Sequence, residues 1–235
     1  MTLNKPSGNM YPWAYTINFL AGECQYHCQY CYVPNKIAPW LSRMGNDKYY
    51  GEPRLVEEEF KVPLIVPNGY VVFVQSCGDL FGFWVPDLWI IKILERIREF
   101  PQTTFLLQTK NPARLFDFDI PRNCVLGTTI ESNRDYGDTK APSPKERFLA
   151  FKKMPIERQL MIAIEPIKDF DLPVFLAWIG VIQPKFVSIG ADSGENNLVE
   201  PSPLKLKQLL WQMEIITEVR KKKNLNRLLL EEAEV

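Results

Sequence analysis

The stretch AYTINFLAGECQYHCQYCY (Ala14 to Tyr32) joins a β-rich run to a loop that carries three of the chain's five cysteines. Its first seven residues predict a strand, which runs directly into the loop. Cys24, Cys28 and Cys31 then follow within eight residues. Three uses compete for thiols gathered so tightly: a disulfide framework, a zinc site and an iron–sulfur cluster.

The disulfide interpretation is the weakest of the three. Five cysteines in 235 residues, three of them clustered, do not resemble a secreted disulfide scaffold. We therefore expect a reducing cytosol, where adjacent thiols more often bind metal. The N-terminus has no apolar stretch of signal-peptide length, and no apolar run approaches the roughly 20 residues that a membrane span needs. The sequence predicts a cytoplasmic protein with no membrane partner.

The C-x3-C-x2-C spacing bears on the two metal interpretations. A closed zinc site needs four protein ligands, and His27, the only histidine, would supply the fourth. The loop is too tight for an ordinary zinc finger with two ligand pairs. Three thiolates can instead hold three corners of a cubane cluster, which leaves one iron open to an exogenous ligand. We favour Cys24, Cys28 and Cys31 as cluster ligands and keep a non-enzymatic Cys3His zinc module that binds nucleic acid as the alternative.

Short β-rich runs alternate with helical patterns along the rest of the chain. The helix expected over residues 86–100 has apolar side chains at helical spacing, at Leu88, Ile91, Leu94 and Ile97. Six strand–helix units in strict alternation imply a parallel sheet with right-handed crossovers. The expected strands cover residues 14–20, 69–76, 103–109, 124–130, 158–165 and 185–191, and further helices cover residues 112–116, 144–151 and 203–219.

The fold predicted from this alternation is α/β, a partial (β/α)6 barrel with parallel strands, formed by residues 1–235 as one domain. The segment 38–67 is the least regular part of the chain, and we interpret it as an insertion. The C-terminal stretch RKKKNLNRLLLEEAEV (residues 220–235) predicts a charged, solvated helix.

Polar side chains gather where the predicted strands end. Ligands of parallel α/β sheets and barrels bind at the carboxyl ends of the strands, so we expect these residues to face one site. From the second strand to the sixth they are Ser76, Cys77 and Asp79; Gln108 and Lys110; Thr129, Glu131, Ser132 and Asn133; Glu165; and Asp192, Ser193 and Asn196.

The cysteine motif resembles a known family. C-x3-C-x-aromatic-C, at Cys24, Cys28, Tyr30 and Cys31, placed just after the first strand of a six-fold βα chain, is similar to the radical SAM superfamily. The resemblance spans nearly the whole chain. It implies the partial barrel described above and an enzyme of that superfamily.

Three further segments resemble the spore photoproduct lyase-like branch of the superfamily: VQSCGDLFG (residues 74–82), LLQTK (residues 106–110) and GTTIESNR (residues 127–134). Two more, AIEPIKDFDL (residues 163–172) and SIGADSGEN (residues 188–196), are similar to a phage-associated family of uncharacterised radical SAM proteins.

The resemblance implies two cofactors, a 4Fe-4S cluster on the three cysteines and S-adenosyl-L-methionine (SAM) on the open iron. One electron from the reduced cluster cleaves SAM to a 5′-deoxyadenosyl radical, and the protein positions that radical. The partner that supplies the electron is expected to be a flavodoxin or a ferredoxin.

The resemblance also implies roles for residues at the strand ends. The expected SAM contacts are Ser76 and Asp79 at the methionine amine, Lys110 at its carboxylate, Glu131 or Ser132 at the ribose hydroxyls, Tyr30 beside the cluster and the adenine, and Glu165 at the mouth of the barrel.

Cys77 is the candidate catalytic residue. In spore photoproduct lyase a cysteine in the matching segment donates a hydrogen atom to the product radical, although SCGD in this chain is one residue shorter than the lyase pattern. The alternative is a small buried cysteine that only packs. Cys124 opens a strand and is interpreted as a core residue.

The lyase resemblance favours a nucleobase in DNA, RNA or a nucleotide as the substrate, with lyase, repair or modification chemistry. A peptide or a small metabolite is the alternative. The chain has 28 basic and 28 acidic side chains, so no overall field recruits nucleic acid. Stacking on a base would instead use aromatic side chains. The candidates are Tyr49, Tyr50, Phe81, Phe83 and Trp84.

Overall fold

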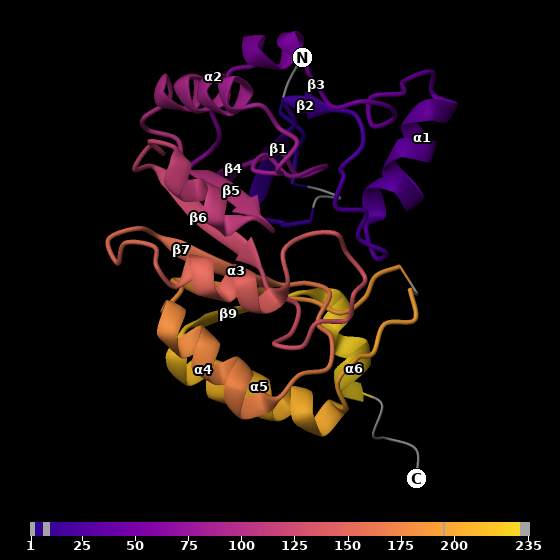
Figure 1. The fold of residues 1–235 in the computed structure, drawn as a ribbon, viewed down its shortest axis with the longest axis vertical. Coiled ribbons are helices and arrows are strands. Elements are labelled where there is room, and N and C mark those ends of the chain that lie inside the picture. Colours follow the sequence, from indigo (N-terminus) through magenta and orange to yellow (C-terminus); the bar gives the residue numbers. More distant parts are fainter. Residues whose placement is uncertain (1–2, 7–9, 195, 231–235) are drawn as a thin grey trace. The chain divides into compact units, whose positions relative to one another are not determined.

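The computed structural model describes residues 3–6, 10–194 and 196–230 of the chain. Its elements fall into two compact units, which Figure 1 shows with their labels. The first unit comprises residues 1–27 and 31–126, and the second comprises residues 28–30 and 127–235. Strands and helices alternate along most of the chain, as predicted.

Three parallel strands form the centre of the first unit: β1 (Ala14–Ile17), β4 (Val71–Val74) and β5 (Phe105–Thr109). In this register Val74 pairs with Ile17 on one side and with Leu107 on the other. Most side chains of the three strands are buried, which is why they read as continuous apolar runs.

The long helix of the first unit is α2 (Asp87–Arg98), and its buried face differs in part from the predicted one. Leu94 and Ile97 are buried as predicted, whereas Leu88 and Ile91 are exposed. Residues 88–91 are all large and apolar, so two neighbouring stripes satisfy the helical spacing, and only packing selects between them. The side chains that α2 buries are Ile90, Ile93, Leu94 and Ile97.

The segment 38–67, interpreted above as an insertion, contains regular structure of the first unit. β3 (Arg54–Leu55) pairs antiparallel with β2 (Leu20–Ala21), the strand that leads into the cysteine loop. The short helices of this unit are the π-helical η1 (Val33–Ile37), α1 (Ala38–Arg43), and the 3-10 turns η2 (Glu57–Lys61) and η3 (Pro112–Asp117).

Gly22 marks the start of the cysteine loop, directly after β2. Its φ of 86° lies in the left-handed region, and a Cβ atom added there would stand 2.5 Å from the carbonyl carbon of Glu52 and 2.7 Å from the Cα atom of Pro53. Only glycine permits so close a backbone approach. The loop therefore begins from a tightly fixed position.

The chain passes into the second unit within β6 (Cys124–Thr129). There β7 (Leu160–Ile164), β8 (Phe186–Ile189) and β9 (Glu218–Lys221) pair in parallel, with Ile189 opposite both Ile164 and Lys221. The order of the strands in the seven-stranded sheet is β1-β4-β5-β6-β7-β8-β9, so they follow one another in chain order. The prediction of an α/β fold with successive parallel strands is confirmed.

The helices of the second unit are α3 (Pro144–Phe151), α4 (Leu172–Ile182), α5 (Pro203–Ile216) and α6 (Asn226–Leu230). Ser143 and Glu146 form a reciprocal capping box that fixes the start of α3. The rings of Phe148 on α3 and Trp178 on α4 stack at 4.5 Å, and α4 packs beside α5 (Figure 1).

The predicted C-terminal helix is wrong over its first residues. Residues 218–221 form β9, and Lys223–Leu225 form the 3-10 turn η4 before α6 begins. Residues 218–221 form a strand because they pair with β8. The ladder of backbone hydrogen bonds to β8 outweighs the weak helical preference of a charged stretch. Residues 231–235 of the predicted helix lie outside the described residues. Within the part of the chain that is described, no helix has the length and apolar content to cross a membrane.

Candidate functional site

The cysteine loop joins β2 to η1. Cys24 and Cys31 belong to the first unit and Cys28 to the second, and each side chain is partly exposed. None of the five cysteines, all of which the structure describes, forms a disulfide, so the disulfide interpretation is wrong. His27 is exposed and has a φ of 46°, which places it at a left-handed turn of the loop.

The donor chemistry of the loop fits a cluster with three protein ligands, because three reduced thiols follow one another at C-x3-C-x2-C spacing. Among the described residues, no three or more His, Cys, Asp or Glu side chains are grouped so as to hold a metal ion. The assignment of Cys24, Cys28 and Cys31 therefore rests on the kind and spacing of the donors.

In the second unit, residues 28–30 of the loop are bound by the segment that follows β6. The Cys28 Sγ atom lies 3.1 Å from the Thr139 Oγ1 atom, and the Gln29 backbone N–H donates to the Asp138 carbonyl oxygen at 3.0 Å. The Tyr30 hydroxyl donates to the Glu131 carboxylate. Each residue of the Cys28–Tyr30 segment thus has its own partner.

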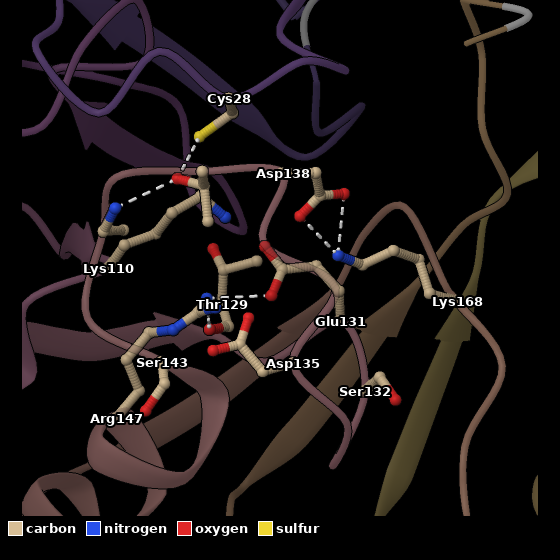
Figure 2. A network of polar contacts seen from close by, with 12 residues as sticks. Cys28, Lys110, Thr129, Glu131, Ser132, Asp135, Asp138, Ser143, Arg147 and Lys168 are labelled. Atoms are coloured by element: carbon tan, nitrogen blue, oxygen red, sulfur yellow. Dashed lines mark hydrogen bonds and ion pairs between the residues drawn. The ribbon is translucent and has the colours of Figure 1, made fainter. Parts of the chain in front are cut away.

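Glu131, which accepts from the Tyr30 hydroxyl, also forms a fully buried ion pair with Arg147 (Figure 2). The Arg147 Nη1 atom lies 2.8 Å from Glu131 Oε2 and 2.6 Å from the Thr129 carbonyl oxygen. Burial is the largest single influence and would lower the pKa of Arg147, but the charge of Glu131, its hydrogen bond and the neighbouring Tyr30 and Cys28 together outweigh it, so the pKa is raised. Burial and then the Glu131 charge raise the pKa of Tyr30 well above its usual value. The Tyr30 phenol therefore stays protonated and remains a donor to Glu131.

A second buried ion pair lies beside the same loop segment. The Lys168 Nζ atom lies 2.9 Å from both carboxylate oxygens of Asp138, and the two side chains are only 3% and 8% exposed (Figure 2). The same ammonium group stands 5.4 Å from the Tyr30 ring centroid and 5.0 Å from that of Tyr136. Cation–π attraction adds to the ion pair, so Lys168 joins Tyr30 to the loop that contains Asp138.

Sequence reasoning missed Asp138, Arg147 and Lys168. A signal for Arg147 was present, because it lies on the same helical face as the buried Phe148 and Phe151 of α3, where a charged side chain needs a partner. For Asp138 and Lys168 no local pattern of the sequence indicates burial.

In the first unit, Asp79 ties the ends of β4 and β5 together. Its Oδ1 atom accepts from the Thr109 hydroxyl at 2.7 Å and from the Phe81 N–H at 3.0 Å, and its Oδ2 atom accepts from the Lys110 N–H at 2.7 Å. Burial raises the pKa of Asp79, and these three donors partly offset that shift. The structure thus brings Asp79 and the backbone of Lys110 together, as their positions at adjacent strand ends predicted.

Ser76 and Cys77 follow β4 and are held by Asn18, which follows β1. The Asn18 Oδ1 atom accepts from the Cys77 N–H at 2.8 Å and from the Ser76 hydroxyl at 3.3 Å. The Tyr32 hydroxyl donates to the Ser76 carbonyl oxygen at 2.8 Å, so it ties the end of the cysteine loop to the end of β4.

The Cys77 side chain is partly buried against an apolar cluster of Val33, Ala38 and Tyr49, on which Cys31 and Tyr32 also pack. Burial raises the pKa of both Tyr32 and Tyr49 well above the usual range, and the Cys77 thiol adds to both shifts. The Cys77 sulfur therefore lies among protonated phenols and apolar side chains.

Ser132 and Glu165, predicted to contact SAM or substrate, both have partners in the second unit. Ser132 is fully buried, donates to the Asp169 carbonyl oxygen at 2.5 Å and accepts from the Arg134 N–H at 3.0 Å. Glu165, at the end of β7, forms an ion pair of 2.5 Å with Lys222, and burial lowers the pKa of that lysine.

The aromatic residues considered for base stacking divide by exposure. Phe81 and Tyr49 are buried core residues, whereas Phe83 is 65% exposed and Tyr50 is 38% exposed. Phe83 meets the Trp84 ring edge-on at 5.1 Å, and its ring centroid lies 6.2 Å from that of Tyr26 in the cysteine loop. Phe83 is therefore an exposed aromatic side chain that lies next to the loop.

Comparisons with known proteins identify a matching family and solved structures with a similar fold. A family model described as a protein of unknown function (DUF5131) matches residues 15–200. No curated protein matches the sequence. A solved structure of a cysteine-to-serine mutant of spore photoproduct lyase matches with a TM-score of 0.60 and 14% identity, over 88% of this chain and 76% of that chain.

A second solved structure, a double mutant of spore photoproduct lyase with bound AdoMet and dinucleoside spore photoproduct, matches with a TM-score of 0.50 and 14% identity. It covers 85% of this chain and 61% of that chain. At this identity the likeness shows the fold alone, which is that of spore photoproduct lyase. The similarity to a phage-associated branch stays a prediction.

Proposed function

The chain belongs to a protein family of unknown function, DUF5131, and from this premise we propose that it is a radical SAM enzyme of the cytoplasm. One observation carries the proposal. Three reduced thiols at C-x3-C-x2-C spacing stand on the loop after the first strands of a parallel α/β fold, and spore photoproduct lyase has the same fold.

Cys24, Cys28 and Cys31 would hold a 4Fe-4S cluster, and SAM would take the open position. When bound, these groups supply the one-electron cleavage of SAM to methionine and a 5′-deoxyadenosyl radical. The electron comes from a small redox protein such as a flavodoxin or a ferredoxin.

The residues of the first unit are the SAM contacts in this proposal. The Asp79 carboxylate offers about four lone-pair sites and uses three of them within the chain, which leaves one for the methionine amine. Ser76 contributes a hydroxyl at the same strand end, and the Lys110 ammonium matches the methionine carboxylate. Their hydrogen bonds to Asn18 and Asp79 hold this strand end in position before any ligand arrives.

The residues of the second unit have a supporting role. Glu131 and Ser132 are fully buried and bonded within the chain, so we now assign to them the positioning of Tyr30 and of the loop after β6 rather than contacts to the ribose. Tyr30 lies next to Cys31 in sequence and shields that side of the loop. Glu165 stays a candidate contact at the end of β7.

Cys77 is the proposed hydrogen-atom donor to the product radical. The S–H bond breaks homolytically, the hydrogen atom goes to the carbon radical of the product, and the sulfur keeps the unpaired electron. Its packing against Tyr49, Tyr32 and apolar side chains supports this role, because it keeps the sulfur partly away from bulk water.

A nucleobase in DNA, RNA or a nucleotide is the substrate class that we propose. The dinucleoside photoproduct bound by the structural neighbour and the exposed Phe83 ring next to the loop support this choice. Stacking of a base on an aromatic side chain contributes about 1–3 kcal/mol.

The cofactor chemistry is tested by anaerobic reconstitution with iron and sulfide, followed by dithionite and SAM. We expect a brown protein that releases 5′-deoxyadenosine, and a Cys28→Ala variant that releases none. Cys124→Ala is the matched control, since Cys124 is a buried residue at the start of β6, and it should keep the activity. A colourless protein that binds one zinc ion and releases no 5′-deoxyadenosine would contradict the proposal.

The substrate class is tested with short oligonucleotides that carry 2-aminopurine, whose fluorescence falls when the base stacks. Phe83→Ala should abolish the quenching, while Phe116→Ala, at a ring that is 50% exposed on η3, should leave it unchanged. Binding should weaken steeply with salt. If the protein turns over SAM but binds no oligonucleotide, the substrate is instead a peptide or a small metabolite.

A further inference from the structure

Thr139 lies against one of the three cysteines of the loop, with its Oγ1 atom 3.1 Å from Cys28 Sγ. We propose that the Thr139 hydroxyl donates a hydrogen bond to the Cys28 sulfur and thereby raises the reduction potential of the cluster that Cys28 helps to hold. The inference rests on the proposed function and deepens it, because it names a residue that tunes the electron transfer.

The direction of the hydrogen bond follows from the chemistry of its two partners. Thr139 Oγ1 accepts from the Ala141 backbone N–H at 3.1 Å, and a hydroxyl that accepts in this way can still donate its proton. A thiolate that binds iron carries no proton and is only an acceptor. Thr139 is therefore the donor and Cys28 the acceptor.

The loop that carries Thr139 is fixed at Asp138, the residue before it. The carbonyl oxygen of Asp138 accepts from the Gln29 N–H at 3.0 Å. This backbone hydrogen bond joins the neighbour of Thr139 to the neighbour of Cys28, directly beside the contact between the two side chains. The Asp138 carboxylate is held by the buried Lys168 ammonium at 2.9 Å. A hydroxyl on such a braced loop loses little freedom when it donates, so its hydrogen bond is preorganised.

The expected effect on potential follows from charge. Reduction adds an electron that is shared among the irons and their sulfur ligands, so a donor to a ligand sulfur stabilises the reduced state more than the oxidised state. Hydrogen bonds to charged acceptors are roughly twice as strong as neutral ones. Loss of the Thr139 hydroxyl should therefore make the cluster harder to reduce.

The test compares Thr139→Val, which keeps the shape and removes the hydroxyl, with Thr139→Ser, which keeps the hydroxyl. Iron and sulfide content is measured first, and the fraction of reduced cluster is then followed by electron paramagnetic resonance at a series of set potentials. In Thr139→Val we expect the ratio of reduced to oxidised cluster to fall by up to about tenfold at a given potential, which is about 59 mV for a one-electron couple. Thr139→Ser should match the unaltered protein.

Thr139→Ala is the second variant, used if the valine variant takes up too little iron, and it carries the same expectation. An unchanged potential in these hydroxyl-free variants, or an equal shift in Thr139→Ser, would overturn the inference and leave the proposed function intact. Failure of the unaltered protein to assemble a 4Fe-4S cluster would instead overturn the proposed function. The iron content and the potential thus separate the two failures.

Discussion

The two units hold their parts of the cysteine loop by different means. In the first unit the contacts are aromatic and apolar. Tyr26 is 1% exposed and meets the Trp84 ring edge-on at 4.7 Å, and Cys31 packs with Tyr32 on the cluster around Tyr49. Such contacts weaken gradually as atoms are removed.

In the second unit the same loop is held by buried charges. The Tyr30 hydroxyl donates to Glu131 of the Glu131–Arg147 pair, and the Lys168–Asp138 pair lies beside the Tyr30 ring. A buried ion pair adds little net stability when intact, but loss of one partner leaves an uncompensated charge. The comparison indicates that Tyr30 depends on all-or-none interactions of buried charges, whereas the loop residues of the first unit depend on graded contacts.

The largest effect is expected from Arg147→Met, which leaves the Glu131 carboxylate buried without its cation. The free energy of unfolding in urea should fall by about 3–5 kcal/mol. Lys205→Met is the matched control, because Lys205 forms a partly exposed pair with Asp169, and it should cost at most about 1 kcal/mol.

The double variant Arg147→Met/Glu131→Gln sharpens this test. Removal of both charges should recover a large part of the stability that the single variant loses. Equal losses in the single and double variants would mean that packing, not charge, holds the second unit's side of the loop.

Gly22→Ala should have the next largest effect, and it tests the rigid start of the loop in the first unit. We expect a loss of about 3 kcal/mol, of which about 1–2 kcal/mol reflects the left-handed backbone and the rest the clash of the Cβ atom with Glu52 and Pro53. Gly51→Ala is the control, since its φ of 75° is similar but nothing lies within 4 Å of the added atom. Identical losses at Gly22 and Gly51 would show that the close approach is dispensable.

Tyr32→Phe removes only the hydroxyl that donates to the Ser76 carbonyl oxygen. The expected loss is about 0.5–1.5 kcal/mol, because a single neutral hydrogen bond is removed and the ring stays in place. Tyr70→Phe, at a ring that is 40% exposed, should change the free energy of unfolding by less. If Tyr32→Phe lowers the free energy of unfolding as much as Arg147→Met does, the contacts of the first unit are not more graded than those of the second.

The smallest effect is expected at the exposed Asp171, whose pKa is lowered to about 2, first by the hydrogen bond from Arg134. A carboxylate with a lowered folded-state pKa stabilises the fold above its unfolded pKa and loses that contribution as the pH falls towards the folded value. The difference in unfolding free energy between the unaltered protein and Asp171→Asn should therefore be constant near neutral pH and shrink between about pH 4 and pH 2. A difference that does not vary with pH would contradict the pairing.

The positions of β1, β4, β5, β6, β7 and β8 were predictable because strands buried on both faces read as continuous apolar runs. The sequence also indicated Cys77 and Asp79 as residues at a strand end, since strand ends follow directly from strand positions. β9 was not predictable, because its charged residues carry no apolar run and its identity depends on pairing with β8.

The charged residues around Tyr30 were the least predictable part of the candidate site. Burial of Asp138, Arg147 and Lys168 depends on partners that lie 16 to 30 residues away along the chain. Local patterns do not reveal such pairs. The face of α2 was missed for a related reason, since its sequence permits two apolar stripes and the neighbouring elements select one.

β9 is last in the order of the sheet, so one side of it is an edge. Glu218, Arg220 and Lys221 place three charges on this four-residue strand, and the Arg220 guanidinium lies 3.7 Å from the Phe186 ring centroid on β8. Exposed edge strands are templates on which other chains can add and aggregate, and a short strand rich in charge suppresses that growth. We therefore expect the charges of β9 to disfavour association through this edge of the sheet.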